Sequence, residues 1–136
     1  MKSKKKIILI VVVVILVIGA IVGGNYLHSV NKYQDKIKNM TITDVDISTI
    51  ADGTYKGECD VDFIRAKVEV TVKSGVIEKI DLVEHYNDRG EKAEVIVDEI
   101  VNQQQVTVDA VSGATNSSKV IKKAVEDALL KADKKE

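Results

Sequence analysis

The sequence predicts an α+β fold: an antiparallel sheet with flanking helices, preceded by one N-terminal transmembrane helix and a short stalk. Three observations predict it. An unbroken apolar run follows the first lysines, a polar/apolar alternation marks a hairpin in the middle, and two helical stripes follow the hairpin. Strands that precede helices in this order favour an antiparallel sheet over a doubly wound parallel one. The sequence contains no G-x-G-x-x-G or P-loop motif.

The apolar run extends from Ile7 to Gly24 and is 18 residues long. A helix of that length is at the lower limit of what spans a hydrocarbon core of about 30 Å. Four lysines precede the run, whereas residues 23–31 contain no Lys or Arg, so the positive-inside rule places the N-terminus in the cytoplasm and the rest outside. The alternative is a cleaved signal peptide, but the run is long for one and no A-x-A pattern follows. The sequence favours an uncleaved single-pass anchor in residues 1–24.

Residues 25–50 are predicted to form an extracytoplasmic stalk. From Leu27 to Met40 apolar residues recur at spacings of three and four, which indicates a helix. This helix either continues the membrane helix as a spacer, which we favour, or pairs with a second copy through its narrow apolar stripe. Residues 41–50 are polar and irregular.

Two strands joined by a tight turn form the centre of the predicted sheet. In residues 65–73 valines alternate with charged and polar residues, which is the pattern of a strand with one buried face. Ser74-Gly75 supplies the turn, and residues 76–84 return with apolar residues at alternate positions. An earlier segment, residues 54–61, is the predicted first strand.

Two helices are predicted after the polar loop at residues 85–90. The apolar residues of the first fall on one helical face: Ala93, Ile96, Val97, Ile100 and Val101. A short strand is expected at residues 106–108. The closing helix is expected to begin at Ser117 or Ser118, with an apolar stripe of Val120, Ile121, Ala124, Val125, Ala128 and Leu129.

Composition limits the function of the outer part. About 112 residues follow the anchor, which is enough for one domain with a modest core. They carry 16 Lys and Arg against 21 Asp and Glu, a net charge of −5 compared with −1 for the whole chain. This mild acidity argues against nucleic acid or anionic lipid as a partner. The single cysteine, Cys59, cannot form an intramolecular disulfide, and one Cys with two His is too little for a zinc site.

The most informative stretch is V-D-A-V-S-G-A-T-N-S-S, residues 108–118, which leads into the last predicted helix. A loop of small residues at a helix N-terminus leaves backbone N–H groups free, and the helix dipole favours negative charge there. A phosphate group fits such a position. The alternative is that Asn116, Ser117 or Ser118 merely caps the helix.

Within this stretch D-A-V-S-G-A-T, residues 109–115, resembles the flavinylation motif of the FMN-binding domain family. That family includes flavinylated components of the sodium-translocating NADH:quinone oxidoreductase and of the related ferredoxin-linked complex. The resemblance extends to D-G-T-Y-K-G (residues 52–57), the hairpin, the histidine at its end (His85) and the closing helix. It covers nearly all of residues 51–130.

The resemblance implies a covalent cofactor. In the family, a magnesium-dependent flavin transferase joins the phosphate of FMN to the hydroxyl of the motif threonine, outside the cytoplasm. That threonine is Thr115 here, and Ser118 matches a serine that commonly follows it. The other motif residues, which form the segment that the transferase recognises, are Asp109, Ser112, Gly113 and Ala114. Gly113 leaves room for the backbone to approach the phosphate.

The isoalloxazine ring needs an apolar or aromatic wall, for which the candidates are Tyr55, Phe63, His85 and Tyr86. Each has an ordinary alternative role, Tyr55 and Phe63 as sheet residues and His85 as a solvated turn residue. Asn116 and Ser117 stand where family members often have an aromatic residue and a threonine, which affects ring packing more than attachment. The scarcity of aromatic residues predicts a partly exposed flavin.

The resemblance thus implies a bacterial, membrane-anchored, extracytoplasmic flavoprotein that transfers electrons through covalent FMN, with residues 51–136 as the FMN-binding domain. No catalytic nucleophile, base or substrate pocket is evident, which favours a carrier over a complete enzyme. Its partners would be a membrane or extracellular electron donor and acceptor. Two alternatives stay open: a module that binds FMN or another phosphate compound non-covalently, and a structural or adaptor domain of the cell surface.

Overall fold

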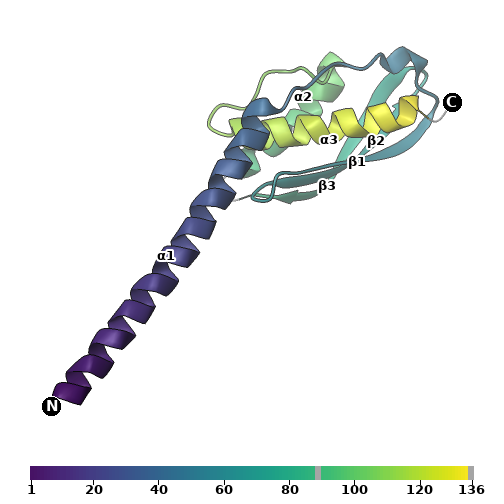
Figure 1. The fold of residues 1–136 in the computed structure, drawn as a ribbon. Coiled ribbons are helices and arrows are strands. Elements are labelled where there is room, and N and C mark those ends of the chain that lie inside the picture. Colours follow the sequence, from purple (N-terminus) through teal and green to yellow (C-terminus); the bar gives the residue numbers. More distant parts are fainter. Residues whose placement is uncertain (88–89, 135–136) are drawn as a thin grey trace. The chain divides into compact units, whose positions relative to one another are not determined.

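The computed structural model describes residues 1–87 and 90–134, and the chain divides into two compact units, residues 1–35 and 36–136. The first unit belongs to the long helix α1 (Lys2–Asn39) (Figure 1). By length and composition α1 can cross a membrane, and 0% of its most apolar window is buried. The predicted apolar helix is therefore present, and it is compatible with a single-pass anchor. It continues without a break through the predicted stalk to Asn39.

The second unit is built on a three-stranded antiparallel sheet in the order β1-β2-β3. The strands are β1 (Gly53–Asp60), β2 (Arg65–Lys73) and β3 (Val76–Tyr86). The alternation in β2 buries one face completely, because its inward side chains are at most 1% exposed: Ala66, Val68, Val70 and Val72. The predicted hairpin is confirmed, with positive φ at both turn residues, and β3 extends two residues beyond the predicted end.

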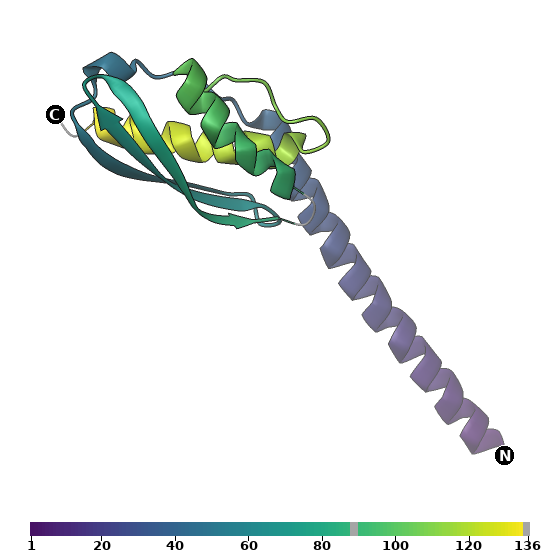
Figure 2. The ribbon, with the colours of Figure 1, turned by 180° about the vertical axis from the view of Figure 1, so that it is seen from behind.

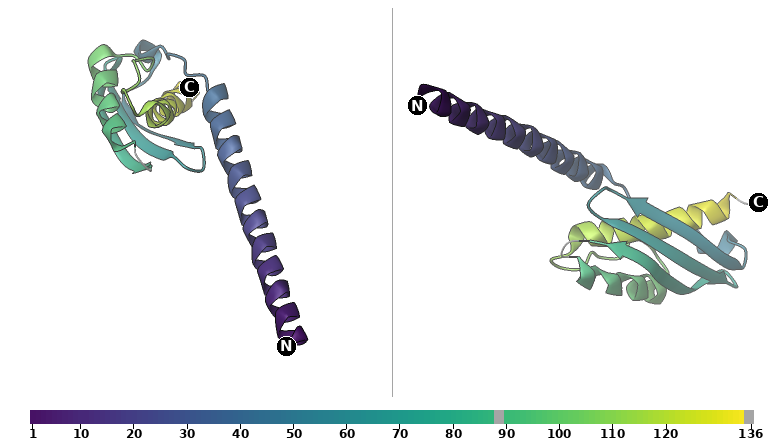
Figure 3. Two further views of the ribbon diagram at one scale, coloured as in Figure 1. Left: turned by 90° about the vertical axis from the view of Figure 1, so that its left-hand side faces the viewer. Right: turned by 90° about the horizontal axis from the view of Figure 1, so that it is seen from below.

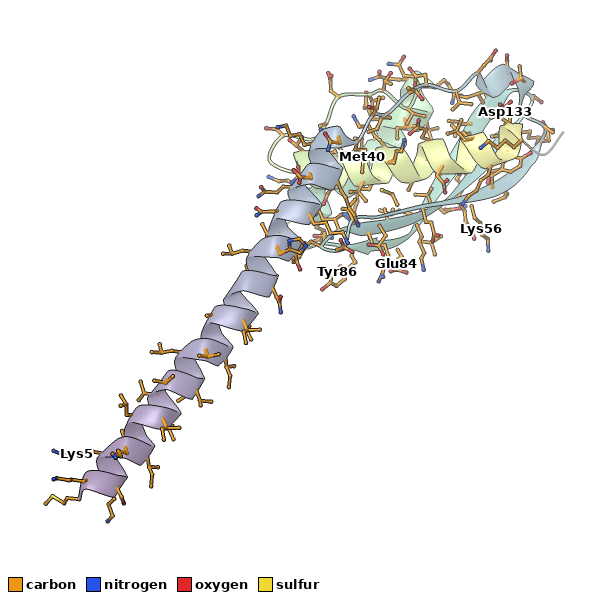
Figure 4. The ribbon with its side chains drawn as sticks, viewed as in Figure 1. Lys5, Met40, Lys56, Glu84, Tyr86 and Asp133 are labelled. Atoms are coloured by element: carbon orange, nitrogen blue, oxygen red, sulfur yellow. The ribbon has the colours of Figure 1, made fainter. Side chains whose placement is uncertain are left out.

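Three helical elements cover the inner face of the sheet. The closing helix α3 (Thr115–Asp133) packs on β1 and β2, while the 3-10 helix η2 (Glu91–Val95) and α2 (Ile96–Gln103) lie beside it toward β3 (Figures 1 and 3). The stripe predicted for the closing helix faces the sheet, and all six of its residues are 0% exposed. The outer face stays polar, with Lys56 and Glu84 pointing away from α3 (Figure 4). The predicted α+β class and antiparallel sheet are confirmed.

Two sequence-based predictions, one of a strand and one of a helix start, are wrong. Residues 106–108 form no strand, although Val106 and Val108 are buried. The N–H groups of Val106 and Thr107 donate to the Asp44 carboxylate, at 2.7 and 3.0 Å, instead of to a neighbouring strand. The closing helix begins at Thr115, before the predicted start at Ser117 or Ser118.

The polar segment between α1 and β1 is held on the second unit by two carboxylates. Besides the Asp44 contact, the N–H and the hydroxyl of Thr43 donate to Glu126 at 3.2 and 2.7 Å. Lys123 donates to the carbonyl of Thr41 at 2.9 Å. The segment then forms the short 3-10 helix η1 (Ile47–Thr49). Residues 41–44 are thereby fixed against α3 and against the segment that leads to the motif.

The hydrogen bonds to the Asp44 carboxylate should contribute measurably to the free energy of unfolding. Burial raises the pKa of Asp44, but hydrogen bonds from Thr107 and Val106 outweigh it and hold the pKa below the ordinary 3.8. Because folding lowers this pKa, the contribution is complete above about pH 4 and is lost as the pH falls through the folded value. We expect Asp44→Ala to lower the free energy of unfolding by about 1 kcal/mol at pH 7, since the exposed carboxylate is screened by solvent.

Urea denaturation followed by circular dichroism at pH 7 and pH 3 checks this expectation. Asp133→Ala removes an exposed carboxylate at the end of α3 and is the matched control. A deficit of Asp44→Ala that stays equally large at pH 3 would contradict the assigned role of the ionised carboxylate.

Candidate functional site

The motif loop leads directly into helix α3. Gly113 has φ +77°, a left-handed conformation that favours glycine. Ala114 is the N-cap residue of α3, and its side chain makes no capping hydrogen bond. Thr115 is the first helical residue and is exposed. The alternative in which Asn116, Ser117 or Ser118 is the N-cap residue is therefore wrong, because all three lie inside the first turns of the helix.

Ser118 orders the motif from inside. Its side chain is fully buried. The hydroxyl accepts a hydrogen bond from the N–H of Val111 at 3.0 Å and donates one to the carbonyl of Ala114 at 2.8 Å. These two bonds fasten both ends of the loop to the first turn of α3. Ser118 thus positions Thr115 and is not itself accessible for modification.

The helix η2 lies against the same loop. A Cβ on Gly90 would overlap the hydroxyl of Ser117, which is 3% exposed, so the chain before η2 touches the first turn of α3. A Cβ on Gly113 would lie 2.8 Å from the Nζ atom of Lys92. The two glycines therefore allow η2 and the motif to approach closely, and they place an ammonium group beside the loop.

A hollow of about 460 Å³ lies between α2 and the segment that begins the motif. Figure 2 shows that segment passing beside α2 on its way to α3. Apolar side chains of Val95, Ile96 and Val111 line the hollow, together with three carboxylates, those of Asp98, Glu99 and Asp109. Val95 is 61% exposed. The volume lies in the range of small-molecule sites.

His85 lies on the inner face of the sheet, because it pairs with the buried Ala66. Its side chain is only 2% exposed, and Nδ1 is 3.0 Å from the Glu94 carboxylate in η2. Among the described residues, nothing hydrogen-bonds to its buried Nε2 atom. The interpretation of His85 as a solvated turn residue is wrong, because β3 extends past it and η2 covers it.

Of the candidates for the aromatic wall, Tyr55 lies away from Thr115. Tyr55 donates to the carbonyl of Ala51 at 2.6 Å. Gly57, two positions later on the same strand, packs against α3 near Ala128. With a rise of about 1.5 Å per residue, Ala128 is about 20 Å along the helix from Thr115. Tyr55 therefore lies toward the far end of α3.

The other two aromatic candidates lie at strand ends. Tyr86 is exposed at the end of β3, with the Arg65 guanidinium 5.9 Å from its ring centre (Figure 4). Phe63 is in the turn between β1 and β2.

The other ionisable groups of the described residues add no second reactive centre. Burial raises the pKa of Cys59 to about 11, so its thiol stays protonated at neutral pH and is a poor nucleophile. Lys122 donates to the carbonyl of Val108 at 2.8 Å, and burial lowers its pKa while Asp109 opposes that shift. Residues 1–87 and 90–134 contain no cluster of His, Cys, Asp and Glu that could hold a metal ion.

The site therefore combines an exposed threonine, the N-terminus of α3 and a nearby ammonium group. Helix N-termini and lysines both stabilise phosphate groups. The residues present fit a phosphoester on Thr115. Sequence reasoning missed Gly90 and Lys92, since both precede the motif by more than 15 residues and no spacing rule connects them.

Comparison with known proteins gives one positive result. Residues 64–130 match the family model described as FMN-binding domain. The chain matched none of the curated proteins and none of the solved structures with which it was compared. The matched residues contain β2, β3, η2, α2, the motif and most of α3, which are the elements that build the site. The resemblance to the FMN-binding domain family is thus confirmed over residues 64–130, about half of the chain.

Proposed function

We propose that this protein is a membrane-anchored, extracytoplasmic flavoprotein that transfers electrons through FMN attached to Thr115 by a phosphoester bond. The observation that carries the proposal is the position of Thr115. It is the exposed first residue of α3, at the end of the motif. A buried hydroxyl would have argued against attachment.

Attachment would proceed by transfer from a flavin nucleotide, catalysed by a separate magnesium-dependent flavin transferase. The threonine oxygen would form a bond to the FMN phosphorus while the phosphoanhydride bond of a flavin dinucleotide breaks. The nucleoside monophosphate leaves with the bridging oxygen, and the threonine proton passes to solvent or to a base of the transferase. The motif residues Asp109 and Ser112 are exposed and accessible to such an enzyme. The product keeps one negative charge, which the N-terminus of α3 stabilises.

Bound FMN supplies the redox chemistry, and the protein supplies attachment and environment. Ser118 holds the loop so that Thr115 has a fixed direction. The hollow beside the motif offers an apolar wall at Val95 and Val111, and its size suits a flavin ring. Its openness to solvent fits a carrier that passes electrons to a partner.

The proposed extracytoplasmic location is supported by α1 and by the charges that flank it. Four lysines precede the apolar run, so the positive-inside rule supports a cytoplasmic N-terminus and an outer FMN-binding domain. A covalent link suits that location, since a reversibly bound flavin would be diluted outside the cell. The donor and acceptor would be redox partners at the membrane or at the outer surface.

The test is to produce the full-length chain with a flavin transferase and magnesium, and to measure its intact mass after denaturation. We expect a gain of one FMN less one water, with flavin absorbance that stays with the unfolded chain. Flavin that leaves on denaturation would instead support the non-covalent module. No flavin at all, with the transferase active on a control substrate, would support the structural or adaptor role.

A further inference from the structure

Lys92 is placed at the motif by the fold. Its Nζ atom lies where a side chain on residue 113 would begin, since a Cβ there would be 2.8 Å from Nζ and 3.3 Å from Cε. Glycine at 113 is favoured by its φ of +77°, and the close approach shows that the lysine tip lies beside the backbone of residue 113. The lysine tip rests against the loop that leads to Thr115.

The backbone that carries Lys92 is fixed on both sides. Gly90 touches Ser117, and the next inward residue of η2, Ala93, is 0% exposed and donates to the carbonyl of Gly90 at 2.9 Å. Glu94 contacts the buried His85 at 3.0 Å. The lysine stem therefore starts from an anchored position, which limits the space that its ammonium group samples.

Lys92 lacks an anionic partner within the described residues, whereas many other lysines of this unit have one. Those with a carboxylate within 3.4 Å are Lys36, Lys56, Lys67, Lys79, Lys123 and Lys131. The two glutamates of η2, Glu91 and Glu94, are both part of the described chain, and neither forms an ion pair with Lys92. Within the described residues this ammonium lies beside the loop without a carboxylate partner, so it is available for an anion.

Thr115 is within reach of this ammonium. Thr115 is two positions after Gly113 along the chain, a separation of at most about 7 Å. The flexible side chain of Lys92 can move its charge over that distance without a change in the backbone. A phosphodiester on Thr115 would carry one negative charge, so one ammonium together with the dipole of α3 would balance it.

We infer that Lys92 is a positioning residue that pairs with the phosphodiester on Thr115 and holds the attached flavin against the first turn of α3. This inference rests on the proposed function, and the group that Lys92 would bind is the phosphodiester of the attached flavin.

The test uses the full-length flavinylated chain, with samples matched for FMN content by intact mass. Lys92→Gln is compared with Lys92→Arg, which keeps the charge, and with Lys73→Gln, the same change at the far end of β2. The readouts are the ³¹P NMR shift of the phosphodiester and the fluorescence anisotropy of the flavin, at low and high salt. Circular dichroism confirms that each variant is folded, as expected for an exposed residue.

In the wild type, the flavin phosphodiester is expected to exchange between a state paired with Lys92 and an unpaired state. In Lys92→Gln we expect the ratio of the first state to the second to fall by up to about fivefold, as for a single exposed charged contact. The ³¹P shift should then move toward that of a flavin phosphodiester in water, and the anisotropy should drop. High salt should reproduce part of this change in the wild type but not in the variant. Lys92→Arg should restore most of the wild-type signal, and Lys73→Gln should match the wild type.

Identical ³¹P shifts and anisotropies for Lys92→Gln and the wild type would overturn the inference. An equal loss in Lys92→Arg and Lys92→Gln would do so too, because charge would not be the cause. If Lys92→Gln fails to acquire FMN while Lys92→Arg acquires it, the charge acts on the phosphate already at attachment, which supports the inference. Failure of the proposed function is a separate result, since the wild type itself would then carry no covalent FMN.

Discussion

Thr115→Val should abolish covalent FMN completely. Valine keeps the branched shape of threonine but has no oxygen to bond to phosphorus. Thr115 is exposed at the start of α3, so we expect the free energy of unfolding to change by no more than about 0.5 kcal/mol. Intact mass spectrometry of the denatured full-length chain, after production with the transferase, measures the attached flavin directly.

Thr71→Val is the matched control, because it makes the same chemical change on β2, where the Thr71 hydroxyl lies 3.2 Å from that of Thr54. It should be flavinylated like the wild type. Thr115→Ser keeps a hydroxyl and should retain part of the modification. An FMN mass on Thr115→Val would show that another hydroxyl is used, and Ser112 would be the first to examine, since it is exposed whereas Ser117 and Ser118 are buried.

Gly57→Ala should cause the largest loss of stability among single substitutions in the sheet. A Cβ at this position of β1 would overlap the carbonyl oxygen of Ala124 and lie 2.5 Å from the N atom of Ala128. Both are backbone atoms of α3, so no side-chain rotation relieves the overlap and the helix must move off the sheet. We expect a loss of about 3 kcal/mol or more in the free energy of unfolding.

Urea denaturation followed by circular dichroism measures this loss, with Lys56→Ala as a control on the same strand. The Lys56 side chain is 82% exposed, and its removal should change stability by no more than about 0.5 kcal/mol. A Gly57→Ala variant as stable as the control would show that α3 can shift without cost. The packing of α3 on β1 would then not be the constraint that fixes the direction of Thr115.

These two predictions test different parts of the same arrangement. Under the proposed function Thr115 would supply the bond to the cofactor, whereas Gly57 sets how closely α3 approaches the sheet. The first turn of the helix is also fixed by the Ser118 hydrogen bonds and by the approach of Gly90 to Ser117. The candidate site is thus built on a well-anchored helix terminus.

The sequence by itself determined the elements whose patterns are local. The alternation of β2 predicts a strand with one buried face, because successive side chains of a strand point to opposite sides. The stripe of the closing helix predicts a buried face, because its spacing matches the turn of a helix. The motif that ends at Thr115 is also local, so its position before a helix and its resemblance to flavinylated domains could be read directly.

Only the tertiary structure decided the features that depend on distant partners. Residues 106–108 have the composition of a strand, but Asp44, 62 residues earlier, supplies the acceptor for Val106. Ser118 could have capped α3, but its hydroxyl is used by the loop. His85 is buried because η2 folds over it. Lys92 reaches the motif because Gly90 and Gly113 have no side chains. Such contacts join parts of the chain far apart in sequence, so no local periodicity encodes them.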